Sequence, residues 1–152
     1  MRAIRGFTII ELLVVLAIGA LLSGIVFWSF VQFRSIEAFN REVRIALTFL
    51  EDAHSKTLAA YDDSRYGVHF TEDSVTLFKG VTYDSDDPEN EVYSLGGGVT
   101  ITDISLAGST SEVVFNRLTG GTSNAGTVTF QNQEGDETQL ITISGTGLVE
   151  IQ

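Results

Sequence analysis

A single carboxylate near the start of a long apolar stretch is the residue best placed to do chemistry. Glu11 follows Gly6-Phe7-Thr8-Ile9-Ile10, and no charged residue occurs from Leu12 to Val31. An ionisable side chain inside a membrane costs about 2.5–3.5 kcal/mol at the centre of a helix, so it indicates a function and a partner of opposite charge. The next cation along the chain is Arg34, beyond the apolar stretch. Glu11 therefore predicts ion pairing with a cation that the stretch itself does not supply.

The apolar stretch has the length of a membrane span. Its twenty residues, 12–31, would form a helix about 30 Å long, which is enough to cross the hydrocarbon core of a bilayer. Arg2 and Arg5 precede the stretch, and short basic segments stay on the cytoplasmic side of a membrane. The sequence therefore predicts a single span, with the residues that follow it outside the cytoplasm.

A cleaved secretory signal is the main alternative for such a stretch. It would place a cleavage site among small residues after the apolar residues. Small residues do occur between 17 and 24, but the helical pattern continues through them, and the natural break is at Gly6. Gly19 and Gly24 allow either local melting of the helix or close packing against another helix, and the sequence leaves both open.

The segment Gly6–Ile18, which reads GFTIIELLVVLAI, closely resembles the N-terminus of type IV prepilins and type II secretion pseudopilins. The resemblance implies cleavage between Gly6 and Phe7 by a membrane prepilin peptidase, followed by methylation of the new Phe7 amine. It also implies that Glu11 pairs with the Phe7 amine of a neighbouring subunit, which would remove two isolated charges from a medium of low dielectric constant. The plainer alternative is that Glu11 is an interfacial acid with no special partner.

An amphipathic pattern follows the apolar stretch. Apolar residues recur at spacings of three and four, which is one stripe of a helix; they are Ile36, Phe39, Val43, Ala46, Leu47, Leu50, Ala53 and Leu58. The opposite face carries the charged residues Glu37, Arg41, Glu42, Arg44, Glu51, Asp52 and Lys56. We therefore expect one helix of about 50 residues, with an assembly and membrane part at 7–33 and an amphipathic part at 34–60.

From Tyr61 onward the apolar period changes to two, and short turn segments separate the apolar runs. The predicted strands are 66–70, 75–78, 92–95, 99–104, 112–115, 127–130, 140–143 and 148–151. Short connections favour antiparallel pairing. The expected fold class is α+β, with the long helix packed on an antiparallel β-sheet head at 61–152, after a cleaved basic leader at 1–6.

Two parts of the predicted head carry a second resemblance. The hairpin at 66–80 and the C-terminal segments 113–120, 126–130 and 141–151 resemble the H-type minor pseudopilins and related minor pilins, the GspH/FimT family. This implies a structural subunit of a type II secretion pseudopilus or type IV pilus-like filament, held first in the bacterial inner membrane. The implied partners are other pilin subunits, the inner-membrane assembly machinery and membrane lipid. The chain lacks cysteine, so it departs from the many pilins with a C-terminal disulfide loop.

Charge argues against nucleic acid as a partner. Residues 61–152 contain fifteen acidic and three basic residues, a net charge of −12, and such a surface repels phosphate. A surface-displayed binding module, either an adhesin or a DNA-uptake minor pilin, stays the alternative function.

An enzyme is not expected, because the sequence has no nucleophile elbow or phosphate loop and neither histidine has a motif partner. We expect His54 at the boundary of the head and His69 directed to solvent.

An acidic loop at 84–91 is the only candidate metal site in the sequence. Asp84, Asp86 and Asp87 would supply the first oxygen ligands to Ca²⁺. An EF-hand needs glycine at its sixth position, where this loop has Glu89. A mobile, solvated loop without a bound ion is therefore the favoured interpretation, and no cofactor is expected.

Overall fold

The computed structural model describes residues 7–152, apart from the side chains of 28–33. The predicted leader at 1–6, including Gly6, lies outside the described residues. Two compact units divide between Glu37 and Ala38, and each is described by itself.

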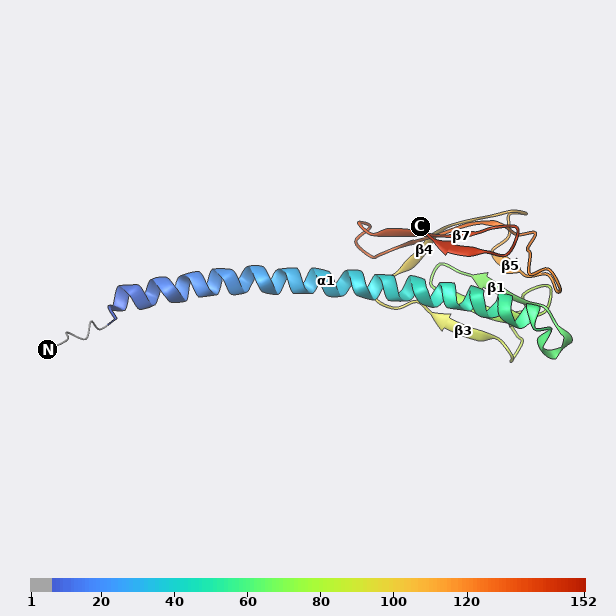
Figure 1. Cartoon of the computed structure of the whole chain (residues 1–152), viewed down its shortest axis with the longest axis horizontal. Coiled ribbons are helices and arrows are strands. Elements are labelled where there is room, and N and C mark those ends of the chain that lie inside the picture. The colour runs from blue at the N-terminus through green and yellow to red at the C-terminus, as the bar shows by residue number, and fades with distance from the viewer. Residues whose placement is uncertain (1–6) are drawn as a thin grey trace. The chain divides into compact units, whose positions relative to one another are not determined.

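Helix α1 spans Ile9–Leu58, a run of 50 residues, which confirms the predicted long helix (Figure 1). Its first turn is capped, because the Thr8 hydroxyl accepts the Glu11 backbone N–H at 3.3 Å. In the first unit, the segment Ile9–Phe27 is long and apolar enough, by length and composition, to cross a membrane.

The second unit, Ala38–Gln152, contains two four-stranded sheets with the orders β3-β2-β1-β5 and β4-β6-β7-β8. The first sheet contains β1 (Tyr66–Phe70), β2 (Ser74–Lys79), β3 (Glu91–Ser94) and β5 (Glu112–Val114). The second contains β4 (Thr100–Leu106), β6 (Gly126–Gln131), β7 (Thr138–Ile143) and β8 (Val149–Ile151). All neighbouring strands pair antiparallel. The predicted α+β class is confirmed, and strands form at all eight predicted positions.

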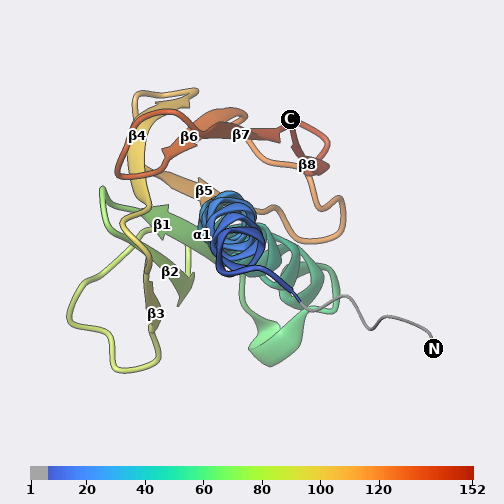
Figure 2. The same cartoon turned by 90° about the vertical axis from the view of Figure 1, so that its left-hand side faces the viewer.

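The strands of the head divide into two sheets, a number that the sequence did not predict, and the division falls between β3 and β4. Gly97 and Gly98 adopt φ values of 64° and 74°, a left-handed conformation that glycine adopts without steric cost. The chain turns there, so β4 pairs with β6 and not with β3. Figure 2 shows β1, β2 and β3 apart from β4, β6 and β7.

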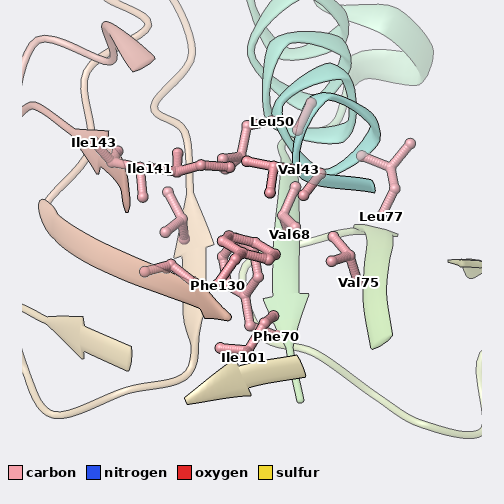
Figure 3. Close-up of a cluster of buried hydrophobic side chains, with 14 of the residues drawn as sticks. Val43, Leu50, Val68, Phe70, Val75, Leu77, Ile101, Phe130, Ile141 and Ile143 are labelled. Atoms are coloured by element: carbon pink, nitrogen blue, oxygen red, sulfur yellow. The ribbon is translucent and has the colours of Figure 1, made fainter. Parts of the chain in front are cut away.

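The apolar stripe of α1 packs between the two sheets. Phe39, Val43, Ala46, Leu50 and Ala53 are all at most 2% exposed. Their partners in the core come from both sheets and include Val68, Phe70, Val75, Phe130, Ile141 and Ile143 (Figure 3). The helical part at 38–58 therefore belongs to the same hydrophobic core as the strands.

Glu42 is an exception to the predicted charged face, because it is only 8% exposed. Its carboxylate accepts hydrogen bonds from the Tyr93 hydroxyl at 2.8 Å and from the Gly96 backbone N–H at 3.0 Å. Burial, together with this hydrogen bond to Glu42, raises the pKa of Tyr93. Two donors that are remote in the sequence thus compensate the burial of this charge.

A short turn ends the helix. Ala60, Asp62 and Asp63 all have φ between 50° and 54°, within the 3₁₀ turn η1 (Tyr61–Asp63) or next to it. Lys79 pairs with Asp62 at 3.2 Å, and Arg117 pairs with Asp63. These contacts, from Lys79 at the end of β2 and from Arg117 in the loop after β5, hold the turn in a conformation that non-glycine residues rarely adopt.

Candidate assembly site

Glu11 is the third residue of α1, and Thr8 is its N-cap. A threonine followed three positions later by glutamate is the spacing of a capping box, a signal that our sequence analysis did not use. Here only half of the box forms: Thr8 accepts from the Glu11 backbone, whereas the Glu11 carboxylate makes no hydrogen bond or ion pair to any described residue. A free carboxylate at this end of a helix interacts favourably with the helix dipole and can accept a further cation.

Phe7 lies just before the helix and is 77% exposed. Its backbone nitrogen would become a primary amine if the chain were cleaved after Gly6, which lies outside the described residues. Such an amine and a carboxylate can form a charge-assisted hydrogen bond. The structure thus leaves Phe7 and Glu11 both accessible at the start of α1 but brings no cation to Glu11.

The helix surface beyond Glu11 is apolar on all sides. The exposed large residues include Ile9, Ile10, Leu12, Leu13, Val14, Val15, Leu16, Ile18, Leu21, Leu22, Ile25, Val26 and Phe27. A continuous apolar surface of this extent is not stable in water, so it indicates contact with lipid or with other subunits. A helix that is hydrophobic all round is typical of a buried or membrane-embedded element.

The carboxylates of the acidic loop accept hydrogen bonds within the loop. Asp84 accepts the Asp86 backbone N–H at 3.0 Å, and Asp87 accepts the Glu89 backbone N–H at 2.9 Å. These carboxylates therefore cap turns within the loop. Across residues 7–152 the structure brings together no three histidine or acidic side chains that could hold a metal ion. The structure thus gives the calcium interpretation of Asp84, Asp86 and Asp87 no support.

Two lysines tie the loop to the rest of the unit. Lys79 contacts Glu89 at 3.2 Å in addition to Asp62, and Lys56 contacts Asp52 at 2.9 Å and Glu91 at 3.1 Å. Burial works against the charged form of Lys56, but the two carboxylates outweigh it and raise the pKa of Lys56. Ion pairs thus connect Glu89 and Glu91, at the C-terminal end of the loop of like charges, to the rest of the unit.

The prediction that His69 points to solvent is wrong. Its ring stacks on Tyr83 at 4.0 Å between centroids, with the planes 9° apart. The Nδ1 atom is buried and has no hydrogen-bond partner. His69 of β1 pairs with Glu112 of β5. Alternation along β1 predicts that the His69 side chain faces solvent, but Tyr83 from the loop at 81–90 stacks on its ring. The periodicity of β1 does not indicate the path of that loop. His54 is half-buried, as expected for a boundary residue, and lies edge-on to Phe115 at 5.1 Å.

The half-buried His69 ring makes stability depend on pH. Burial lowers the pKa of His69 below its usual value, and the Glu112 carboxylate opposes this only partly. His69 therefore binds its proton at a higher pH in the unfolded chain than in the folded chain. The contribution of neutral His69 to the free energy of unfolding is complete above about pH 6.5, and it is lost as the pH falls through the folded-state pKa. We expect the melting temperature of the native chain to fall between pH 7 and pH 5 relative to that of His69→Phe, which keeps the stack on Tyr83. Parallel curves for the two proteins would contradict this.

Comparison with protein families finds a match at the N-terminus. The profile of the prokaryotic N-terminal methylation motif matches residues 1–27, a range that includes Gly6, Phe7 and Glu11. The chain carries a type IV pilin-like prepilin signal. The motif implies processing by a prepilin peptidase and assembly with pilin subunits in general. No curated protein and no solved structure matches the chain.

The motif supports a pilin-like precursor and suggests a structural subunit rather than an enzyme. The apolar segment Ile9–Phe27 is consistent with a membrane-anchored pilin.

Proposed function

We propose that this chain is a minor pilin or pseudopilin, a structural subunit of a type II secretion pseudopilus or type IV pilus-like filament. The observation that carries the proposal is the methylation motif at residues 1–27, whose apolar helical segment Ile9–Phe27 is exposed and has a free carboxylate at Glu11. The resemblance of the head to H-type minor pseudopilins favours the minor class. The order of the elements, one long helix and then antiparallel strands, supports the same assignment.

The proposed life cycle has two stages. The precursor lies in the bacterial inner membrane, with the leader 1–6 in the cytoplasm, the helical part 7–33 in the bilayer, and the amphipathic part 34–60 and the head 61–152 outside. Prepilin peptidase cleaves between Gly6 and Phe7, and the Phe7 amine is methylated. The inner-membrane machinery then moves the chain from lipid into a filament, where the Glu11 carboxylate pairs with the Phe7 amine of a neighbour.

Intact-mass analysis of membrane fractions tests the processing step. In a host with a prepilin peptidase, we expect mature chains that begin at Phe7 and carry one methyl group. Gly6→Leu places a bulky side chain at the cleaved bond and is the matched control, which we expect to keep residues 1–6. Mature native material that still contains the leader would rule out the proposed pairing, because the Phe7 amine would not exist.

A further inference from the structure

The C-terminal end of α1 carries most of the exposed large apolar side chains of the second unit. Residues 38–152, all of which the structure describes, contain six such side chains. Four of the six lie together at this end, and we call them the end surface; they are Leu58, Tyr61, Leu118 and Leu148. An exposed apolar patch indicates contact with another protein or with a membrane.

Contacts between segments that are remote in the sequence bring the end surface together. A Cβ atom at Gly120, in the loop after β5, would lie 3.2 Å from Cδ2 of Leu58 in the last turn of α1. A Cβ atom at Gly147, in the turn between β7 and β8, would lie 3.0 Å from the carbonyl carbon of Gly120. Arg117 donates a hydrogen bond to the backbone oxygen of Asp63 at 2.8 Å, so the loop after β5 also reaches η1. Figure 1 shows the end of α1, η1 and this loop at one end of the second unit.

The backbone is strained at the same place. Five non-glycine residues have positive φ in the described part of the chain, and four of them lie in η1, beside it or in the loop after β5; they are Ala60, Asp62, Asp63 and Leu118. Leu118 has a φ of 71° and is 94% exposed. Two backbone hydrogen bonds close its loop, from the Asn116 N–H to the Gly121 oxygen at 2.7 Å and from the Gly120 N–H to the Asn116 oxygen at 2.9 Å. A closed loop that holds an apolar side chain in solvent, at a cost in backbone free energy, is typical of a binding site.

The charge of this end differs from that of the other strands and loops. The strands and loops that follow α1 contain three basic residues, and all three lie close to η1 in the sequence or pair with it; they are Arg65, Lys79 and Arg117. Lys79 and Arg117 are paired with carboxylates of η1, whereas Arg65 is exposed and its side chain makes no hydrogen bond or ion pair with a described residue. The other strands and loops carry acidic side chains and no basic ones. They repel an acidic partner, and Arg65 attracts it to this end.

We infer that the end surface binds a segment of another protein that presents apolar side chains and a carboxylate. The apolar side chains cover Leu58, Tyr61 and Leu118, and the carboxylate pairs with Arg65. A second copy of this chain is a poorer partner, because contact through the same surface brings two Arg65 side chains together. An anionic membrane presents an extended charge that the acidic strands and loops repel, whereas a protein segment meets only this end. Binding here goes beyond the proposed function and does not require cleavage after Gly6, because the end surface lies within the second unit.

Photocrosslinking of the full chain in its native host tests this binding. Ala59→p-benzoylphenylalanine places a photoreactive group beside Leu58, at an exposed position, and keeps all four residues of the end surface. We expect illumination to link the chain to one protein of different sequence. Mass spectrometry of the adduct is expected to locate the link beside apolar residues and a carboxylate.

The matched control is Thr48→p-benzoylphenylalanine, at another exposed position of the same helix, about 16 Å nearer its N-terminus. We expect this control to give about tenfold fewer adducts with the same protein. Equal yields at the two positions, adducts only with a second copy or with lipid, or no adduct from position 59 would overturn the inference.

Two variants that carry the same photoreactive group at position 59 test the chemistry of the surface. We expect Arg65→Glu and Leu118→Asp each to reduce the yield of adduct about tenfold, and Arg65→Lys to keep most of it. Both side chains are exposed, so the melting temperature is expected to stay the same, which separates lost binding from unfolding. Lysine in place of the partner's carboxylate is expected to restore the adduct with Arg65→Glu.

Native yields of adduct from both variants would overturn the inference. Its failure is distinguishable from failure of the proposed function, because intact mass reports processing at Phe7 independently of the crosslink. A chain that is processed normally but gives no adduct from position 59 leaves the proposed function standing. A chain that keeps its leader but gives the expected adduct supports the end surface alone.

Discussion

Glu11→Gln is expected to leave the chain processed and folded but to reduce its incorporation into filaments more than a hundredfold. The substitution keeps the size of the side chain and removes its charge, so the Phe7 amine of the neighbouring subunit has no counter-ion in an apolar bundle. Removing one member of a buried ion pair costs about 3–5 kcal/mol, and each 1.4 kcal/mol changes an equilibrium about tenfold. The measurement is the ratio of filament-associated to membrane-associated chain, by immunoblot of sheared and membrane fractions.

The matched control for this experiment is Glu150→Gln, which removes another exposed carboxylate, from β8. We expect it to assemble as the native chain does. The circular dichroism spectrum of Glu11→Gln in detergent is expected to match that of the native chain, because the exposed Glu11 side chain makes no hydrogen bond or ion pair with a described residue. Normal incorporation of Glu11→Gln would show that Glu11 is an interfacial acid without a special partner.

Phe130→Ala has the largest expected effect on the stability of the second unit. Phe130 is fully buried in β6, between Ile101 of β4 and Gln139 of β7, and it belongs to the core shared by α1 and both sheets (Figure 3). Phenylalanine to alanine substitutions in a core cost about 3–5 kcal/mol, which is a large part of the total stability of a typical domain. Denaturant unfolding of the full chain in detergent, followed by circular dichroism, measures this loss.

Leu118→Ala is the control for this prediction, because Leu118 is also a large apolar residue but is 94% exposed. We expect it to change the free energy of unfolding by less than about 0.5 kcal/mol. Equal losses for the two variants would mean that Phe130 is not part of a packed core.

The regular elements could be predicted because they depend on local pattern. The spacing of Phe39, Val43, Ala46 and Leu50 indicates one helical face, and the structure buries that face. Alternation of apolar and polar residues located all eight strands. Neither signal says which strands pair, because pairing depends on where the chain turns, and the left-handed Gly97 and Gly98 separate β3 from β4.

Local pattern gave the wrong exposure for residues whose contacts come from distant parts of the sequence. Glu42 follows the charged residue Arg41 in the sequence, yet it is buried because Tyr93 and Gly96 supply hydrogen bonds from a distant segment. His69 occupies a solvent-facing position by alternation, yet the ring of Tyr83 covers it. The partners of Glu42 lie in β3 and in the turn after it, and the ring over His69 comes from a loop. The periodicity of one segment does not indicate where a distant segment packs.

The sequence alone determined the candidate assembly site, since the apolar stretch, the isolated Glu11 and the residues before it form a contiguous segment whose chemistry depends on residue type and spacing. It also determined the helix and the strands. Only the tertiary structure decided the two sheets, the ion pairs of the acidic loop and the apolar surface at the C-terminal end of α1. Those features join residues far apart in the chain, and their energy arises only when folding brings the partners together.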